Sequence, residues 1–125
     1  MRDKETTTRN TLEQGRAQHA FEKAKGVSDK DKFASYAKKM PMMIKTNGLG
    51  ASMAFAFSKK DWTDVYNTIE DWLQKKEYIS EGSRGKLIDD IVKMDSTRYR
   101  IVTNEVLAYL TWLRRFAEGF KQEKE

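Results

Sequence analysis

The chain has 125 residues, of which 38% are hydrophobic and 34% are charged, and its formal net charge is +5. This length is typical of one domain, and the composition excludes both a disordered chain and a membrane-embedded one. The longest uncharged run, Thr46 to Ser58, is too short and too polar to span a bilayer, and the N-terminus lacks the apolar stretch of a secretory signal.

Apolar residues recur at helical spacing in five segments, whereas one proline and seven glycines are too few for the turns of a β-sandwich or barrel. The first predicted helix runs from about Thr8 to Lys25 and carries a stripe of mostly small side chains. Ser28 to Asp31 has the pattern of an N-terminal cap and begins a second helix, which Pro41 ends or kinks. One further turn leads to Asn47-Gly48, a pair suited to the left-handed conformation that closes a helix.

The second half of the chain continues the helical pattern. A helix that starts near Gly50 has Ser52 as its only polar side chain, so we expect it to be buried. Ser58 to Asp61 repeats the capping pattern before the clearest amphipathic stripe, and a loop over about residues 77–86 precedes a short helix. The last helix, about Ser96 to Phe120, is apolar on more than one side, so it is either central in the bundle or partly covered by a partner.

Together these segments predict one all-α domain over residues 1–125. We expect a compact bundle of about five to six helices with a long C-terminal helix. Three large apolar side chains are expected in its core: Trp62, Trp72 and Leu110.

Charge is unevenly distributed along the chain. Residues 1–60 hold 13 Lys and Arg against 6 Asp and Glu, whereas residues 61–125 hold 11 against 13. No acid occurs between Asp31 and Asp61. The lysines of this stretch are either ordinary solubilising charges or contacts to a polyanion such as a nucleic acid.

Two motifs that suggest chemistry have simpler explanations. Asn47 to Gly50 is a glycine-containing turn before a helix, but it lacks the preceding strand and the spacing of a nucleotide-binding loop, so a corner between helices is favoured. The adjacent acids Glu70-Asp71 and Asp89-Asp90 diverge on a helix, which favours a solvated face over a catalytic pair.

Residue types that support catalysis are scarce. The absence of cysteine excludes disulfides and thiolate chemistry and favours a cytoplasmic setting, and His19 is the only histidine, for which we expect a packed or surface position. Arg114 and Arg115 lie beside aromatic residues and have the chemistry to stack on bases, but a position near a helix C-terminus is the favoured explanation. The sequence therefore predicts no enzyme activity, metal, cofactor or small-molecule substrate.

Three segments carry the pattern of a known family. They are QGRA at residues 14–17, YAKKMPMMIKTNGLG at residues 36–50 and EVLAYLTWLRRFAEG at residues 105–119. In order and spacing they resemble the small helical subunit of the type III-B CRISPR Cmr effector complex, over about residues 14–120.

The resemblance implies a non-catalytic structural subunit of an antiviral ribonucleoprotein. Such a subunit stacks in copies beside other Cmr subunits, along the groove that holds CRISPR RNA paired with target RNA. Because base pairing reads the sequence in such a complex, the protein needs only basic and polar groups that face phosphates. The candidate RNA-binding residues are the lysines of the acid-free stretch and two arginines: Lys38, Lys39, Lys45, Lys59, Lys60, Arg16 and Arg115.

Two alternatives from other classes stay open, a helical DNA-binding domain and a generic protein-interaction module. For DNA binding, Asn47-Gly48 would be the turn of a helix-turn-helix motif, and base-reading side chains would have to follow it. Residues 49–57 offer only Ser52. An enzyme is the third class, and it lacks a thiol or any motif around the single histidine.

Overall fold

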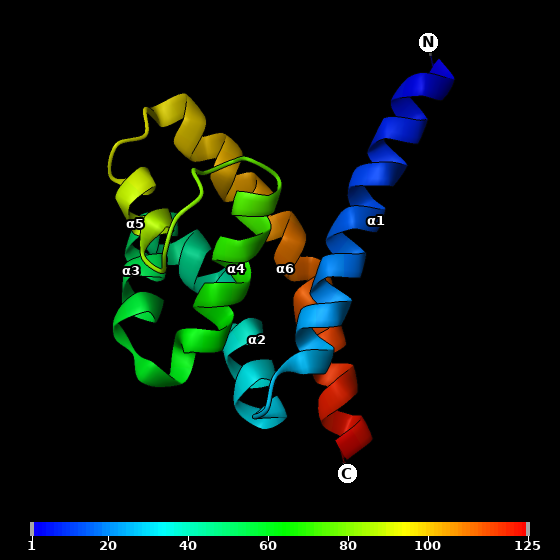
Figure 1. Cartoon of the computed structure of the whole chain (residues 1–125), viewed down its shortest axis with the longest axis vertical. Coiled ribbons are helices and arrows are strands. Elements are labelled where there is room, and N and C mark those ends of the chain that lie inside the picture. The colour runs from blue at the N-terminus through cyan, green and yellow to red at the C-terminus, as the bar shows by residue number, and fades with distance from the viewer. Residues whose placement is uncertain (1, 125) are drawn as a thin grey trace.

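Six α-helices and one 3₁₀ turn make up the regular structure of residues 2–124, the part that this computed structural model describes; side chains are described for residues 11–122. No strand occurs in this part (Figure 1). The elements are α1 (Arg2–Gly26), α2 (Lys30–Asn47), α3 (Leu49–Ser58), η1 (Lys60–Trp62), α4 (Thr63–Lys75), α5 (Lys86–Ile91) and α6 (Ser96–Lys124). The all-α class and the long C-terminal helix are confirmed.

The first and last helices lie side by side and run in the same direction, although α1 begins at Arg2 and not near Thr8 as predicted. Arg16 of α1 bonds to Glu105 of α6, and one turn further on His19 bonds to Tyr109. The N-terminal half of α1 projects beyond the bundle, while α3, α4 and α5 form the opposite side of the molecule (Figure 1). α2 packs against α6 in the reverse direction, so α6 contacts both α1 and α2.

α6 is the central helix of the core. Its inward side chains are fully or almost fully buried: Val102, Val106, Tyr109, Leu110, Leu113 and Ala117. The predicted burial of Trp62, Trp72 and Leu110 is confirmed, and the ring of Trp72 stacks on that of Tyr109 with centroids 5.2 Å apart. Each large side chain removed from water in this way contributes roughly 1.5 to 3 kcal/mol to folding.

The ends of α2 differ from the prediction in two details. Asp29, not Ser28, is the N-cap, because its carboxylate accepts the backbone N–H of Lys32 at 3.0 Å. Pro41 does not end the helix, although an end there was one of the two predicted alternatives; α2 continues to Asn47 and buries Ile44 beyond the proline. Gly48 then stops it with φ +90° and ψ 159°, an extended positive-φ conformation open to glycine, not the left-handed helical one.

α3 is only half buried, contrary to the prediction. Its inner face holds Leu49, Ser52, Met53 and Ala56, and the hydroxyl of Ser52 is buried with no hydrogen-bond partner among the described residues. Ser58 does not cap the next helix. Its hydroxyl donates to the carbonyl of Phe55 at 2.8 Å, and the η1 turn intervenes before α4. The outer face of α3 is exposed and apolar, and its residues are Ala51, Ala54, Phe55 and Phe57; we call it the α3 outer face.

Candidate nucleic-acid interface

Two adjoining hollows lie between α2 and α6. The first, of about 410 Å³, is lined by Lys38, Arg114, Arg115, Glu118, Gly119 and Gln122. The second, of about 500 Å³, is lined by Lys38, Pro41, Met42, Lys45, Leu107, Ala108, Thr111 and Arg114. Since both contain Lys38 and Arg114, they form one continuous surface. We call it the α2–α6 groove and define it by its cations Lys38, Lys45, Arg114 and Arg115.

Helical spacing explains why these cations face one another. Lys38 and Lys45 are two turns apart on α2, and Arg114 is two turns beyond Leu107 on α6, so each pair shares one helix face. Because the two helices are antiparallel, the Lys38 end of α2 lies beside the Arg114 end of α6. The fold thus brings together cations from α2 and α6, two helices that are distant in the sequence.

The four cations of the groove are exposed. Within residues 11–122, none of them forms an ion pair or a hydrogen bond, and the acid among the lining residues is Glu118, at the end of the first hollow. Adjacent like charges without counter-ions on the protein create a positive potential that attracts a polyanion. The floor between them includes Leu107 and the exposed Met42.

Two other predicted lysines lie elsewhere, against aromatic rings. The ammonium of Lys39 lies 5.6 Å from the ring centroid of Tyr36, and that of Lys59 lies 5.6 Å from the ring centroid of Phe55. Both rings pack on Trp62, Tyr36 by stacking and Phe55 edge-on. These lysines therefore belong to a different surface from the α2–α6 groove.

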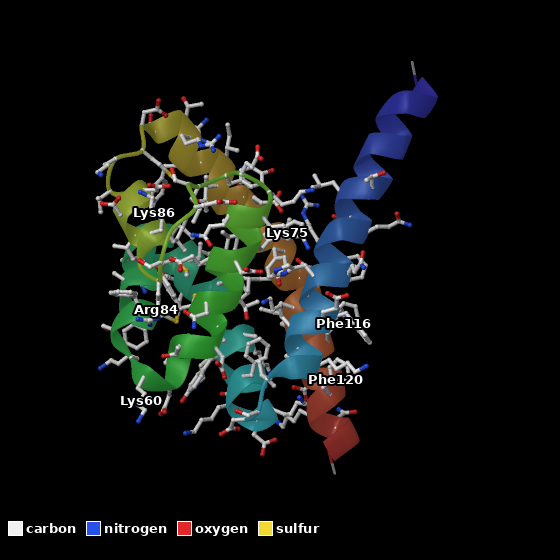
Figure 2. All side chains as sticks on the ribbon, in the orientation of Figure 1. Lys60, Lys75, Arg84, Lys86, Phe116 and Phe120 are labelled. Carbon is white, nitrogen blue, oxygen red and sulfur yellow. The ribbon has the colours of Figure 1, made fainter. Side chains whose placement is uncertain are left out.

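Lys60 has acidic neighbours in the folded chain. It lies near the turn between α3 and α4 (Figure 2) and lines a hollow of about 170 Å³ that also contains Asp29, Asp61 and Asp64. Within the same hollow, Lys32 pairs with Asp61 at 3.3 Å. The stretch that lacks acids in the sequence thus gains them from the preceding and following segments.

Arg16 is held by two carboxylates. Its guanidinium donates to Glu105 at 2.8 and 2.7 Å and also to Glu13. Glu105 is buried and accepts further hydrogen bonds from the indole of Trp72 at 2.9 Å and the hydroxyl of Tyr78 at 3.2 Å. Burial alone would raise the pKa of Glu105, but the hydrogen bonds from Arg16, Trp72 and Tyr78 outweigh it and lower that pKa. This geometry favours a structural role for Arg16.

The two arginines of α6 are not near its C-terminus, so that interpretation is wrong. α6 continues for more than two turns beyond Arg115, to Lys124, and the dipole acts only within the last turn. Arg114 was not selected as a candidate, although it lies closer to the centre of the groove than Arg115 and lines both hollows. The sequence signal that could have identified Arg114 is its spacing of two helical turns from Leu107, which places both residues on one face of α6.

The acidic pair Glu70-Asp71 does not form a solvated face, which corrects that prediction. Glu70 is buried and accepts the hydroxyl of Tyr66 at 2.6 Å and the backbone N–H groups of Gly85 at 3.1 Å and Leu87 at 2.9 Å. The hydrogen bonds of Glu70 therefore connect the start of α5 to α4. No sequence pattern indicated this, because the amide donors lie at the start of another helix, 15 and 17 residues further along the chain.

His19 is buried, which confirms the packed position, one of the two predicted alternatives. Its Nε2 donates to the carboxylate of Asp71 at 2.7 Å, so in the neutral ring Nδ1 accepts from the hydroxyl of Tyr109 at 2.5 Å. Burial lowers the pKa of His19 below 6.5, and the hydrogen bond to Asp71 opposes this only in part.

The lowered pKa of His19 predicts a loss of stability in mild acid. Below pH 6.5 the unfolded chain takes up a proton on His19 that the folded chain does not, so the free energy of unfolding falls as the pH drops from 6.5 toward the folded pKa. The slope is at most about 1.4 kcal/mol per pH unit, the value for one proton. Urea unfolding at pH 7.5, 6.5 and 5.5 measures it, with His19→Asn as the variant that lacks this slope. Equal stability of the wild type at pH 7.5 and 5.5 would contradict the packing described.

Two kinds of feature are absent from the described residues, a membrane-spanning helix and a metal-binding cluster. No helix among them is long and apolar enough to cross a membrane. Likewise, no group of three or more His, Cys, Asp and Glu side chains in that part of the chain is arranged to hold a metal ion.

Comparison with known proteins gives a consistent result. The family described as "CRISPR-associated protein (Cas_Cmr5)" matches residues 12–120 of the chain. Among solved structures, the crystal structure of a CRISPR-associated Cmr5 family protein from Thermus thermophilus superposes with a TM-score of 0.72. The two chains are 27% identical, over 86% of this chain and 95% of that one.

Proposed function

Because the chain belongs to the Cas_Cmr5 family and is therefore a subunit of a type III-B CRISPR Cmr complex, we propose that it is a non-catalytic structural subunit whose α2–α6 groove contacts the phosphate backbone of RNA. The observation that supports this most directly is the set of exposed cations in the groove that form no ion pair within residues 11–122, namely Lys38, Lys45, Arg114 and Arg115. The RNA is the target strand paired with CRISPR RNA, and the protein partners are other Cmr subunits and further copies of this chain.

The chemistry of the groove fits a phosphate backbone better than bases. Its lining has four cations and one carboxylate, that of Glu118, and part of the lining between the cations is apolar. Lysine and arginine that neutralise phosphates release condensed counter-ions, which gives affinity without sequence preference. This is sufficient in a complex where base pairing supplies the specificity. Among the predicted RNA-binding residues, we assign phosphate contacts to Lys38, Lys45 and Arg115. We assign the same role to Arg114, which was not among them.

The remaining predicted residues are not part of this proposal. The guanidinium of Arg16 is already paired with carboxylates, and Lys60 lies among aspartates. Lys39 and Lys59 cover aromatic rings on another surface. DNA reading by a helix-turn-helix is also disfavoured, because α3, the helix after the Gly48 turn, presents only alanine and phenylalanine outward before its last residue.

Charge reversal in the groove is expected to weaken target-RNA binding by the reconstituted complex. The test variant is Lys38→Glu with Arg114→Glu, the two residues that line both hollows. We expect at least about tenfold weaker binding at low salt, and a log–log salt slope smaller by about 0.7 for every phosphate of a single strand that the variant no longer neutralises. Filter binding of labelled target RNA at several salt concentrations measures both quantities.

A matched control separates local contact from overall charge. Lys25→Glu with Lys75→Glu makes the same change in net charge at exposed positions on α1 and α4, away from the groove. This control is expected to bind nearly as the wild type does. If the groove variant assembles normally and binds with unchanged affinity and salt slope, the groove carries only solubilising charge.

A further inference from the structure

The α3 outer face is left exposed by the described residues, although its two rings make contacts at their edges with Trp62 and Tyr66. Ala51 and Ala54 are exposed, and the side chains of Phe55 and Phe57 are 39% and 36% exposed. A helix that is apolar on all sides is normally buried on all sides. α3 is such a helix, yet one of its faces points to solvent at the side of the molecule away from α1 (Figure 1). A partner that covers this face would bury α3 on all sides, as its composition requires.

RNA does not suit this face. The guanidinium of Arg84 lies 4.4 Å from the ring centroid of Phe57, and the ammonium of Lys59 lies 5.6 Å from that of Phe55. Because these cations occupy faces of the rings, the rings are not open platforms on which bases stack. The methyl groups of Ala51 and Ala54 offer no hydrogen bonds. The face is therefore suited to the apolar side chains of another protein.

Cations form the rim of this apolar centre. Lys59 and Arg84 lie on its aromatic rings, and Lys39 lies on Tyr36, which joins Phe55 through Trp62. Arg84 holds its place by donating to Asn67 at 3.1 Å and to the carbonyl of Phe57 at 3.0 Å, and Figure 2 shows it on this side of the molecule. None of the three pairs with a carboxylate within residues 11–122. The complementary surface therefore carries acids around an apolar patch.

A second copy of this chain does not supply that surface. The other large exposed apolar side chains of the described residues each have a cation close by. Met42 lies in the groove, and Val92 and Ile101 are next to Lys93 and Arg100 in sequence. Phe21 packs on Phe120, and the ammonium of Lys30 lies 5.9 Å from the ring centroid of Phe120. Setting any of them on the α3 outer face brings like charges together, which opposes association. A different protein is the better match.

We propose that the α3 outer face docks an apolar, acidic surface of another protein subunit of the Cmr complex. The proposal rests on the proposed function, and it assigns this face to protein and the α2–α6 groove to RNA. α3 is about 15 Å long, so it forms the apolar centre of an interface that in total covers roughly 800 Å² on each partner. The cationic rim sets the orientation of the partner and raises the rate of encounter.

The test places a carboxylate at the centre of the face. Ala54→Glu and, separately, Ala51→Glu are exposed helical positions, so both variants are expected to fold, which thermal unfolding checks. Gln18→Glu adds the same charge at an exposed position on α1 and is the matched control. The probe is the set of all other subunits with CRISPR RNA, captured through a tag on another subunit. Native mass spectrometry then gives the number of copies of this chain in each complex.

We expect at least tenfold lower incorporation of Ala54→Glu and Ala51→Glu at limiting concentration, normal incorporation of Gln18→Glu, and an unchanged oligomeric state of the isolated chain. Normal incorporation of both variants overturns the proposal. If both variants are incorporated normally but the complex binds target RNA more weakly, the proposal is also overturned, and the face is an RNA contact instead. An isolated wild-type oligomer that Ala54→Glu dissociates also overturns it in favour of a second copy. If the wild type itself does not enter the complex, the proposed function fails and this proposal fails with it.

Discussion

Replacing Glu105 by Ala is expected to lower the free energy of unfolding by about 3 to 5 kcal/mol, the usual cost of removing one partner of a buried ion pair. The carboxylate is 5% exposed and accepts hydrogen bonds from Arg16, Trp72 and Tyr78. Without it, the indole N–H of Trp72 loses its acceptor inside the core, and Glu13 is the carboxylate that Arg16 retains among the described side chains. Urea unfolding monitored by circular dichroism measures the change.

Two comparisons sharpen the Glu105 prediction. Glu105→Gln keeps an acceptor oxygen and is expected to lose less stability than Glu105→Ala, while the exposed Glu22→Ala is expected to change it by less than about 0.5 kcal/mol. Because the folded pKa of Glu105 lies below 4.5, its contribution is present above that pH and is lost as the pH falls through the folded value. A loss below about 1 kcal/mol for Glu105→Ala would mean that the pair only offsets its own desolvation.

Leu110→Ala is expected to cost about 2 to 5 kcal/mol, the range for a large apolar side chain removed from a packed core. Leu110 is fully buried in the middle of α6, the helix on which both α1 and α2 pack. The cavity left behind adds to the lost transfer energy, because neighbouring helices relax only in part. Denaturant unfolding of the purified chain gives the value, and the exposed Asn104→Ala on the same helix is the control. A change within about 0.5 kcal/mol would place Leu110 outside the cooperative core.

The fold class was predictable because its signal is local. Helical periodicity depends on neighbours three and four residues apart, so the helices and the burial of Trp62, Trp72 and Leu110 follow from the sequence alone. Helix ends were less predictable. Capping by Ser58 failed because its hydroxyl bonds back to Phe55 within the preceding helix, a competing local interaction that a residue pattern does not distinguish.

The candidate site was only partly predictable, because its geometry depends on contacts between distant segments. The lysines of the acid-free stretch belong to one continuous segment of the sequence, yet α2 turns Lys38 and Lys39 toward different neighbours. Arg114 enters the groove only because α6 lies antiparallel to α2. The carboxylate of Glu105 meets the guanidinium of Arg16 across 89 residues of chain. Neither composition nor periodicity contains such pairings.

The pairing of α1 with α6 has a consequence for how the protein is made. The polar groups of α1 that enter the interior, Arg16 and His19, find their partners Glu105 and Tyr109 about 90 residues later in the chain. At ordinary rates of about 5 to 20 residues per second, the ribosome needs about 4 to 18 s to synthesise that stretch. During this time α6, the helix on which most of the inner face of α1 packs, does not exist. The packing of α1 is therefore complete only after α6 has been synthesised, and premature termination of translation leaves α1 without that helix.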